Sequence, residues 1–196
     1  WRGSLGSVDA LLSGTLLRSI PLIAAGLAVA LAFRAGVWNI GAEGQLLAGA
    51  AVYTAFALGP GATLHGFGIV AGLALAAGAG ALWASLASLL RERFGVLEVI
   101  STIMLNFVAM NLVAYLVRGP LQEPLRIYPQ TETIAVAVQL PRLVPGTRVH
   151  IGLLLALVAA AGAWWFLRRT AVGFRLRAIG ASPEAARVTG RVDVGR

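Results

Sequence analysis

The sequence predicts an all-α fold: a polytopic transmembrane helical bundle of about five spans, with a short helix on the inner side of the membrane. Composition is the first reason, because 58% of the residues are hydrophobic and 12% are charged, against about 25% charged in soluble domains. The mean hydropathy of +0.82 agrees. A globular chain of 196 residues cannot hide this much apolar surface from water, so a bilayer must solvate much of it.

Long apolar runs are the second reason, since a spanning helix needs about 20 apolar residues. The predicted spans are residues 19–38, 44–58, 68–90, 96–117 and 151–167. The run at 44–58 is shorter than a full span. Ser19 is expected to cap the first helix, which places Pro21 in the first turn, where its missing N–H costs little. The small residues of AAGAGA, at 76–81, predict close contact between helices.

Arginine placement predicts the orientation, because cytoplasmic loops carry an excess of Arg and Lys. The arginines that follow apolar runs are Arg34, Arg91, Arg93, Arg168, Arg169, Arg175 and Arg177. These ends are placed inside, together with the segment 168–196, and the loops 59–67 and 118–150 are placed outside. In the outer loop 118–150, the alternation of apolar residues over 133–141 predicts a short pair of strands.

Polar residues interrupt the chain between the first two apolar runs, in the sequence NIGAEGQ. Asn39, Glu43 and Gln45 lie there among glycines, at the start of the short run. One interpretation is a helix broken at membrane depth, whose freed backbone groups line a polar path. The other is a tight cytoplasmic turn in which glycine only permits the bend. The residues alone leave both open.

A second polar group lies in the sequence VLEVISTIMLNFVAMN. Glu98, Thr102 and Asn106 are spaced four residues apart, so they share one face of a helix. Ionisable residues in spans usually face a bundle interior or a watery cavity, which makes these side chains candidates for a solute path. The alternatives are hydrogen bonds that pack helices together and, for Glu98, an interfacial position where it neutralises Arg93.

The segment AVGFRLRAIGASPEAARVTGR follows the last apolar run. Ser182 suits a helix N-cap, Pro183 the first helical position and Glu184 the positive start of a helix. A short helix is therefore predicted to begin at Ser182 on the inner side. This helix is either a peg that docks in a partner's cleft or an ordinary loop helix.

Missing residue types exclude several functions. The chain has no Cys, which excludes disulfides and thiolate metal sites. It also has no Lys, and so lacks the lysine of a P-loop. We expect no catalytic residue, no metal site and no nucleic-acid partner. Because the chain begins at Trp1 and ends in TGRVDVGR, we also expect it to be a piece of a longer protein.

Three stretches together resemble one family. GLAVALAFRAGVWNIGAEGQLLAGA, LEVISTIMLNFVAMNLVAYLVRGPL and GFRLRAIGASPEAARVTG are similar to the permease subunits of ABC importers, in the branched-chain amino acid, ribose and simple-sugar permease superfamily. Within it, they resemble the nucleoside and simple-sugar branch. The third stretch is similar to the family's cytoplasmic coupling segment, so the resemblance implies that the short inner helix is a coupling helix. Its residues here are Gly180, Ser182, Pro183, Glu184, Ala185, Ala186 and Arg187.

The resemblance implies a multi-pass permease subunit of an ATP-driven importer in a bacterial or archaeal plasma (inner) membrane. It would move a small polar solute, a nucleoside or a simple sugar, by alternating access. The implied partners are a second permease subunit, a cytoplasmic ABC ATPase that holds ATP and Mg, and an extracytoplasmic substrate-binding lipoprotein. No cofactor is expected in this chain, and ATP hydrolysis is expected in the partner ATPase. Two alternatives stay open, an ion-coupled secondary transporter and a non-transporting membrane scaffold subunit.

Overall fold

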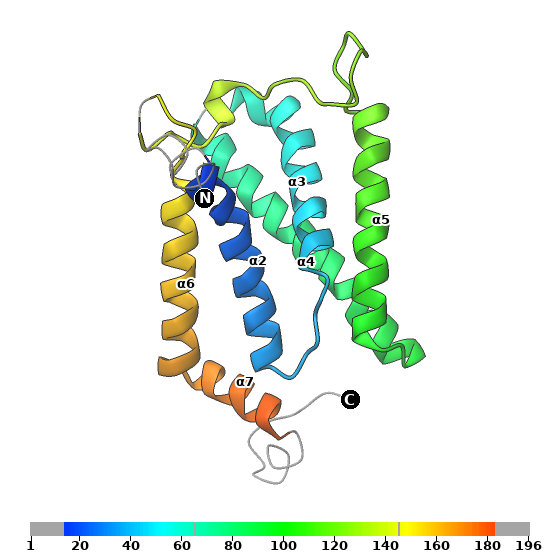
Figure 1. The fold of residues 1–196 in the computed structure, drawn as a ribbon, viewed down its shortest axis with the longest axis vertical. Helices are drawn as coiled ribbons and strands as arrows, with labels where there is room; N and C mark the ends of the chain where they lie inside the picture. The colour runs from blue at the N-terminus through cyan, green and yellow to red at the C-terminus, as the bar shows by residue number, and fades with distance from the viewer. Residues whose placement is uncertain (1–13, 65, 145, 183–196) are drawn as a thin grey trace. The chain divides into compact units, whose positions relative to one another are not determined.

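The structure is a computed structural model that describes residues 14–64, 66–144 and 146–182. The chain divides into two compact units, residues 1–39 with 140–196 and residues 40–139. The helices of the first unit are α2 (Leu17–Arg34), α6 (Gly152–Arg169) and α7 (Ala171–Ala181). Those of the second are α3 (Ala42–Leu58), η2 (Pro60–Thr63), α4 (Gly66–Phe94), α5 (Glu98–Arg118) and η3 (Val136–Val138) (Figure 1). The predicted all-α class is confirmed.

The first helix begins earlier than predicted, and Ser19 is not its cap. A π-helical turn over residues 14–16 leads directly into α2. The Ser19 hydroxyl instead donates a hydrogen bond of 2.7 Å to the Leu16 carbonyl, one turn back. Pro21 therefore lies inside the helix and not in its first turn. The prediction of a Ser19 cap was wrong because the preceding residues also adopt helical backbone.

The same helix also ends earlier than predicted, at Arg34 instead of residue 38. The Ala35 N–H still bonds to the Leu31 and Ala32 carbonyls, which closes the last turn. Gly36 then takes φ +79°, a left-handed conformation that glycine adopts without a steric penalty and that commonly ends helices. Residues 37–41 are not helical. The interruption in the chain is thus longer than the sequence predicted.

A helix that the sequence analysis did not predict, α7, directly follows α6 in the first unit. The hydroxyl of Thr170 caps it by accepting a hydrogen bond of 3.0 Å from the Gly173 N–H. Its end is Ser182, where the backbone is extended, as expected for a residue before proline. The helix predicted to begin at Ser182 lies outside the described residues. So do the predicted coupling residues Pro183, Glu184, Ala185, Ala186 and Arg187.

Small residues bring α3 and α4 into close contact in the second unit, where α4 crosses α3 obliquely (Figure 1). A Cβ on Gly49 of α3 would lie 2.9 Å from the Ala76 carbonyl oxygen of α4. A Cβ on Gly80 of α4 would lie 3.2 Å from the Gln45 carbonyl oxygen. The close helix contact predicted from AAGAGA is confirmed, because the two backbones touch where a side chain would keep them apart.

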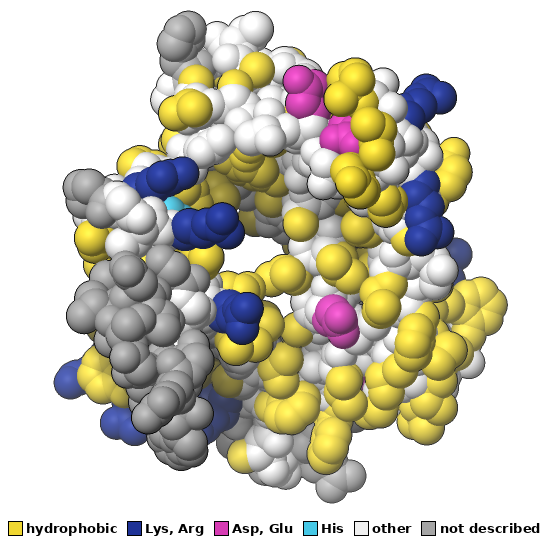
Figure 2. Space-filling view, turned by 45° about the horizontal axis from the view of Figure 1, so that its top comes forward, with side chains coloured by type: hydrophobic (Ala, Val, Ile, Leu, Met, Phe, Trp, Pro, Cys, Tyr) yellow, Lys and Arg dark blue, Asp and Glu magenta, His cyan; other side chains and the backbone are white. Residues whose placement is uncertain are grey.

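Four helices of the described chain are long and apolar enough to cross a membrane: Gly14–Arg34, Gly66–Phe94, Glu98–Arg118 and Gly152–Arg169. With 17 residues, α3 is about 26 Å long, slightly less than the ~30 Å of a hydrocarbon core. No residue of α2 is buried, and Leu22 on it is 70% exposed. Figure 2 shows apolar side chains over much of the visible surface. This is the surface of a protein whose helices face lipid.

The loop 118–150 contains no strand pair among its described residues, so that prediction was wrong. Val138, within the alternating stretch, belongs to the 3-10 helix η3 and is 1% exposed. The Tyr53 hydroxyl donates a hydrogen bond of 2.6 Å to its carbonyl. The alternation reflects one valine buried beside Tyr53, and not a sheet face. One isolated bridge, between Arg142 and His150, is the only strand-like pairing described.

Glu123 organises the first part of the same loop. Its carboxylate accepts hydrogen bonds from the Gln130 side-chain amide at 2.7 Å and the Tyr128 N–H at 3.0 Å. Its own N–H donates to the Gln130 carbonyl at 2.9 Å. The bond from Gln130, and then that from Tyr128, lower the pKa of Glu123 below its ordinary value of 4.5. The charged carboxylate therefore holds residues 123–130 together.

Acidification should loosen this loop. Since the pKa of Glu123 is lower in the folded loop than in the unfolded chain, its stabilisation is present above the ordinary value and is lost as the pH falls through the lowered one. Glu123→Gln should produce the same loosening at neutral pH. Hydrogen exchange of the Tyr128 amide would report it, with exposed Glu132→Gln as the control. Equal exchange in the two variants would contradict this role.

The α3–α4 contact gives a stability prediction. Gly49→Val in the full-length protein should lower the free energy of unfolding by about 1–3 kcal/mol, because the new side chain must displace the Ala76 backbone. Gly78→Val is the matched control, since a Cβ on Gly78 meets nothing within 4 Å. Thermal unfolding in detergent compares the two, and equal losses would show that the Gly49 contact is not tight.

Candidate functional site at the interrupted helix

The interruption between α2 and α3 frees backbone groups that a continuous helix would pair internally. Some of these groups bond locally. The Val37 N–H donates to the Ala32 carbonyl, and the Asn39 N–H donates to the Val37 carbonyl, both at 3.0 Å. The Gln45 N–H bonds to the Gly41 carbonyl at 3.1 Å and so starts α3. The remaining groups described here are paired by side chains of α5.

Asn106 of α5 pairs two of these backbone groups. Its side-chain nitrogen donates a hydrogen bond of 3.0 Å to the Ile40 carbonyl. Its side-chain oxygen accepts one of 2.8 Å from the Gly44 N–H. A Cβ on Gly44 would lie 2.9 Å from that oxygen and 3.0 Å from Nε1 of Trp83, so only glycine allows α5 to approach this closely.

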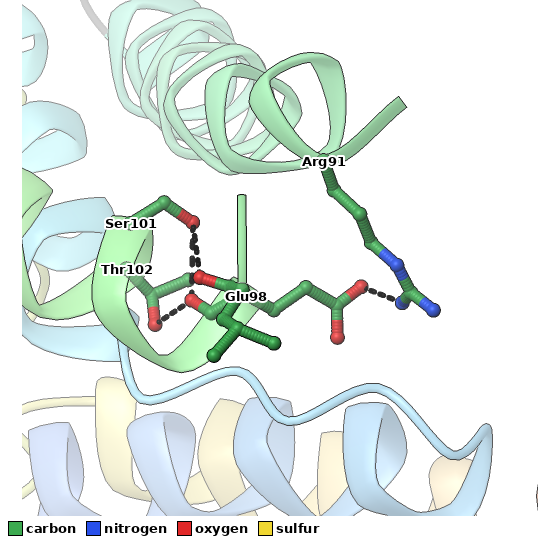
Figure 3. A network of polar contacts seen from close by, with 5 residues as sticks. Arg91, Glu98, Ser101 and Thr102 are labelled. Carbon is green, nitrogen blue, oxygen red and sulfur yellow. Dashed lines mark hydrogen bonds and ion pairs between the residues drawn. The ribbon is translucent and has the colours of Figure 1, made fainter. Parts of the chain in front are cut away.

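Thr102, one turn earlier on α5, pairs a third group. Its hydroxyl accepts a hydrogen bond of 3.3 Å from the Ile40 N–H and donates one of 2.7 Å to the Glu98 carbonyl. The residue is 4% exposed, as is Ser101 beside it, whose hydroxyl also donates to the Glu98 carbonyl (Figure 3). Ile40, Gly44, Thr102 and Asn106 together are called the junction site below.

Glu98 forms an ion pair with Arg91 of α4, and not with Arg93 as predicted (Figure 3). The Glu98 side chain is 13% exposed, whereas that of Arg91 is 56% exposed. Pairs with one partner in solvent contribute little stability. Glu98 thus links the start of α5 to the last turn of α4.

The other predicted path residues lie on the interrupted segment or at the start of α3. Asn39 and Gln45 are half-buried, and Glu43, in the first turn of α3, is exposed. Thr102 and Asn106 are thus brought to the interruption, as helix-packing residues would be. The structure adds that their hydrogen bonds to this segment go to freed backbone groups and not to another side chain.

The position of the junction site along α5 bears on the two interpretations of NIGAEGQ. Asn106 lies eight residues after Glu98, which is about 12 Å along a helix about 31 Å long. Non-helical backbone within a membrane is tolerated only where it is buried in protein or lines a watery cavity. The contacts come from the second and third turns of α5. They therefore support the interpretation of a helix broken at membrane depth, and not that of a tight turn outside the membrane.

Sequence reasoning missed a cavity of about 650 Å³ within the second unit, between α3, α4 and α5. Ala51, Trp83 and Leu112 are among its apolar lining residues, and no predicted path residue lines it. A polar solute would lose its hydrogen bonds to water there without replacing them. Nε1 of Trp83 is itself buried without a hydrogen-bond partner. The sequence signal for this cavity was Trp83, whose indole N–H is a hydrogen-bond donor inside an apolar span.

Comparison with known proteins assigns the family. The model of the family described as "Branched-chain amino acid transport system / permease component" matches residues 11–194. The chain belongs to this permease family. It is 40% identical over 190 residues to the glucose ABC transporter permease protein TsgB13 of Haloferax volcanii, covering 91% of this chain and 50% of that protein. It is 36% identical over 198 residues to the guanosine ABC transporter permease protein NupP of Bacillus subtilis, covering 97% and 55%.

The family predicted from the three stretches is thus confirmed, and the apolar helices identify a multi-pass membrane protein. The chain spans about half the length of the curated relatives it matches. No solved structure matches this permease chain.

The junction site predicts a difference between two asparagines of α5. Asn106→Leu should lower the free energy of unfolding of the full-length permease by about 1–3 kcal/mol, because the part-buried Gly44 N–H loses its partner, while the exposed Ile40 carbonyl adds less. Asn111→Leu is the matched control, since the exposed Asn111 amide bonds only to Phe107 in its own helix. Thermal unfolding and hydrogen exchange at the Gly44 amide compare them. Equal effects would mean that water already replaces Asn106.

Proposed function

We propose that this chain is part of the transmembrane permease subunit of an ATP-driven importer for a small polar solute, a nucleoside or a simple sugar. Transport would proceed by alternating access in the plasma membrane of a bacterium or archaeon. The ATPase would be a separate cytoplasmic subunit that binds ATP and Mg, so this chain would need no cofactor of its own. A second permease subunit and an extracytoplasmic substrate-binding lipoprotein would complete the importer.

The observation that carries this proposal is the junction site in a chain of this permease family. Three backbone groups at an interruption of the helical chain are paired from one face of α5, well inside the length of that helix. Discontinuous helices of this kind mark solute sites in transporters. A scaffold subunit gains nothing from an interruption that side chains must then compensate.

The solute class is supported by the chemistry around the junction site. Asn39, Gln45 and Glu43 lie on the interrupted segment or the start of α3, where amide side chains offer both donors and acceptors to hydroxyls or bases. The similar proteins are named for glucose and guanosine. An ion-coupled mechanism would need a deep acidic relay, and Glu98 is already paired with Arg91. The residues thus favour a neutral polar solute.

The energy for switching would come from the partner ATPase. Reversing a two-state population from 1:99 to 99:1 takes about 5.5 kcal/mol of differential binding. The coupling residues Gly180, Ser182, Pro183, Glu184, Ala185, Ala186 and Arg187 would receive that movement on the inner side. Closure of the ATPase would displace the coupling segment and rock the helices between outward and inward openings.

The first test of this function is solute uptake by cells that carry the full-length system. Glu184→Arg reverses a charge in the coupling segment and should abolish accumulation of the radiolabelled nucleoside or sugar while the protein still reaches the membrane. Glu92→Arg is the matched control, because it makes the same charge change at an exposed position on the predicted inner side outside that segment. It should leave uptake near the parent level.

Two other outcomes would contradict the proposal. Uptake that survives Glu184→Arg and depletion of the ATPase would mean an ion-coupled transporter. A scaffold subunit would be indicated if no nucleoside or sugar were taken up while the partner subunits still assembled, and if Asn106→Leu did not affect that assembly.

A further inference from the structure

Helix α7 contacts the ends of both other helices of its unit through glycine. A Cβ on Gly173 would overlap the Phe166 carbonyl oxygen of α6 and would lie 2.7 Å from the Cα of Leu167. A Cβ on Gly180 would overlap the Arg34 carbonyl oxygen of α2 and would lie 2.9 Å from the nitrogen of Gly36. Each contact is therefore backbone against backbone. Figure 1 shows α7 lying across the adjacent ends of α2 and α6.

One face of α7 makes both contacts. Gly173, Arg177 and Gly180 are spaced at i, i+4 and i+7, which places them in one row along the helix. Nε of Arg177 is buried, which agrees with a side chain on the covered face. The next face of the helix, about 100° from Gly173, is open, since Phe174 is 65% exposed. Contacts of this kind leave no flexible side chain to absorb a shift, because packed backbones transmit strain.

The Gly180 contact lies at the start of the interrupted segment. It involves Arg34, the last residue of α2, and Gly36, the residue with φ +79°. From Gly36 the chain reaches Ile40 in four residues, and Ile40 is held to α5 by Thr102 and Asn106. At its other end, α7 leads into the segment that the proposed function assigns to coupling. The contact thus joins the helix that leads into the coupling segment to the stretch of chain that leads to the junction site.

We propose that Gly180 is a positioning residue for coupling: its backbone contact with Arg34 and Gly36 makes the end of α2 move with α7 when the coupling segment is displaced. The inference rests on the proposed function and deepens it. The Gly173 contact holds α6 to the same helix, so α2, α6 and α7 respond as one body. The start of the interrupted segment is then displaced directly, and no side-chain rearrangement is needed.

The test uses the full-length importer complex in proteoliposomes, with ATP hydrolysis and solute uptake measured on the same sample. Gly180→Leu should lower uptake per ATP hydrolysed about tenfold, within the usual range of coupling between sites. Gly180→Ala should give an intermediate loss. Gly162→Ala on α6 is the control, because a Cβ there meets nothing within 4 Å. Unchanged uptake per ATP in Gly180→Leu would overturn the proposal.

A second measurement reads the contact itself and does not depend on transport. The chain has no Cys, so spin labels in it attach only at Leu22→Cys on α2 and Phe174→Cys on α7, both exposed positions. The distance between them should be narrow and the same with and without a non-hydrolysable ATP analogue, and should shift or broaden in Gly180→Leu. A nucleotide-dependent distance in the parent would show that α7 slides past α2 and would overturn the proposal. This measurement needs only the parent, so it still decides the proposal if Gly180→Leu fails to assemble. If the parent complex shows no ATP-driven uptake, the proposed function is overturned, and the coupling role of Gly180 with it. The distance between the two spin labels would still show whether Gly180 fixes α7 against α2.

Discussion

The side-chain amide of Asn106 is the interaction on which the arrangement around the interrupted helix depends. A chain that stops being helical inside a bilayer frees N–H and C=O groups that water cannot reach. An amide is the uncharged side chain that offers a strong donor and an acceptor together on a planar group. Asn106 uses both, donating to Ile40 and accepting from Gly44 on the two sides of the start of α3. One side chain thus makes the interruption tolerable.

Close backbone approach is the condition for that interaction, and small residues provide it. Asparagine is short, so α5 must lie almost against the first turn of α3, where Gly44 leaves no room for a Cβ beside Asn106 and Trp83. The same requirement continues along α3, where Gly49 lies against the α4 backbone. Lipid provides no hydrophobic force between helices, so this packing and these hydrogen bonds hold α3 in place. The polar residues therefore depend on the small ones, because only close backbone approach lets the Asn106 hydrogen bonds form.

Local patterns predicted the helices and the shared face of Thr102 and Asn106, because length, hydropathy and helical spacing are properties of a short stretch. They could not say what that face meets. Spacing made path and packing equally consistent, and the partner, the backbone of Ile40, lies 62 positions from Thr102. The strand prediction failed for the same reason, since the Val138 carbonyl accepts its hydrogen bond from Tyr53, 85 positions away, and not from a neighbouring strand. The contacts of α7 could not be predicted either, because Gly173 and Gly180 pack against the backbones of α6 and α2, which no local pattern reveals.

The engagement of Thr102 and Asn106 limits how the interrupted segment can move. Leaving the two part-buried N–H groups, those of Ile40 and Gly44, unpaired would cost about 2–6 kcal/mol, at about 1–3 kcal/mol each. That is comparable to the ~5.5 kcal/mol that fully reverses a two-state population. A cycle that separated the start of α3 from α5 would spend most of its driving energy on this step. In the proposed cycle, the start of α3 and the facing turns of α5 would therefore move together.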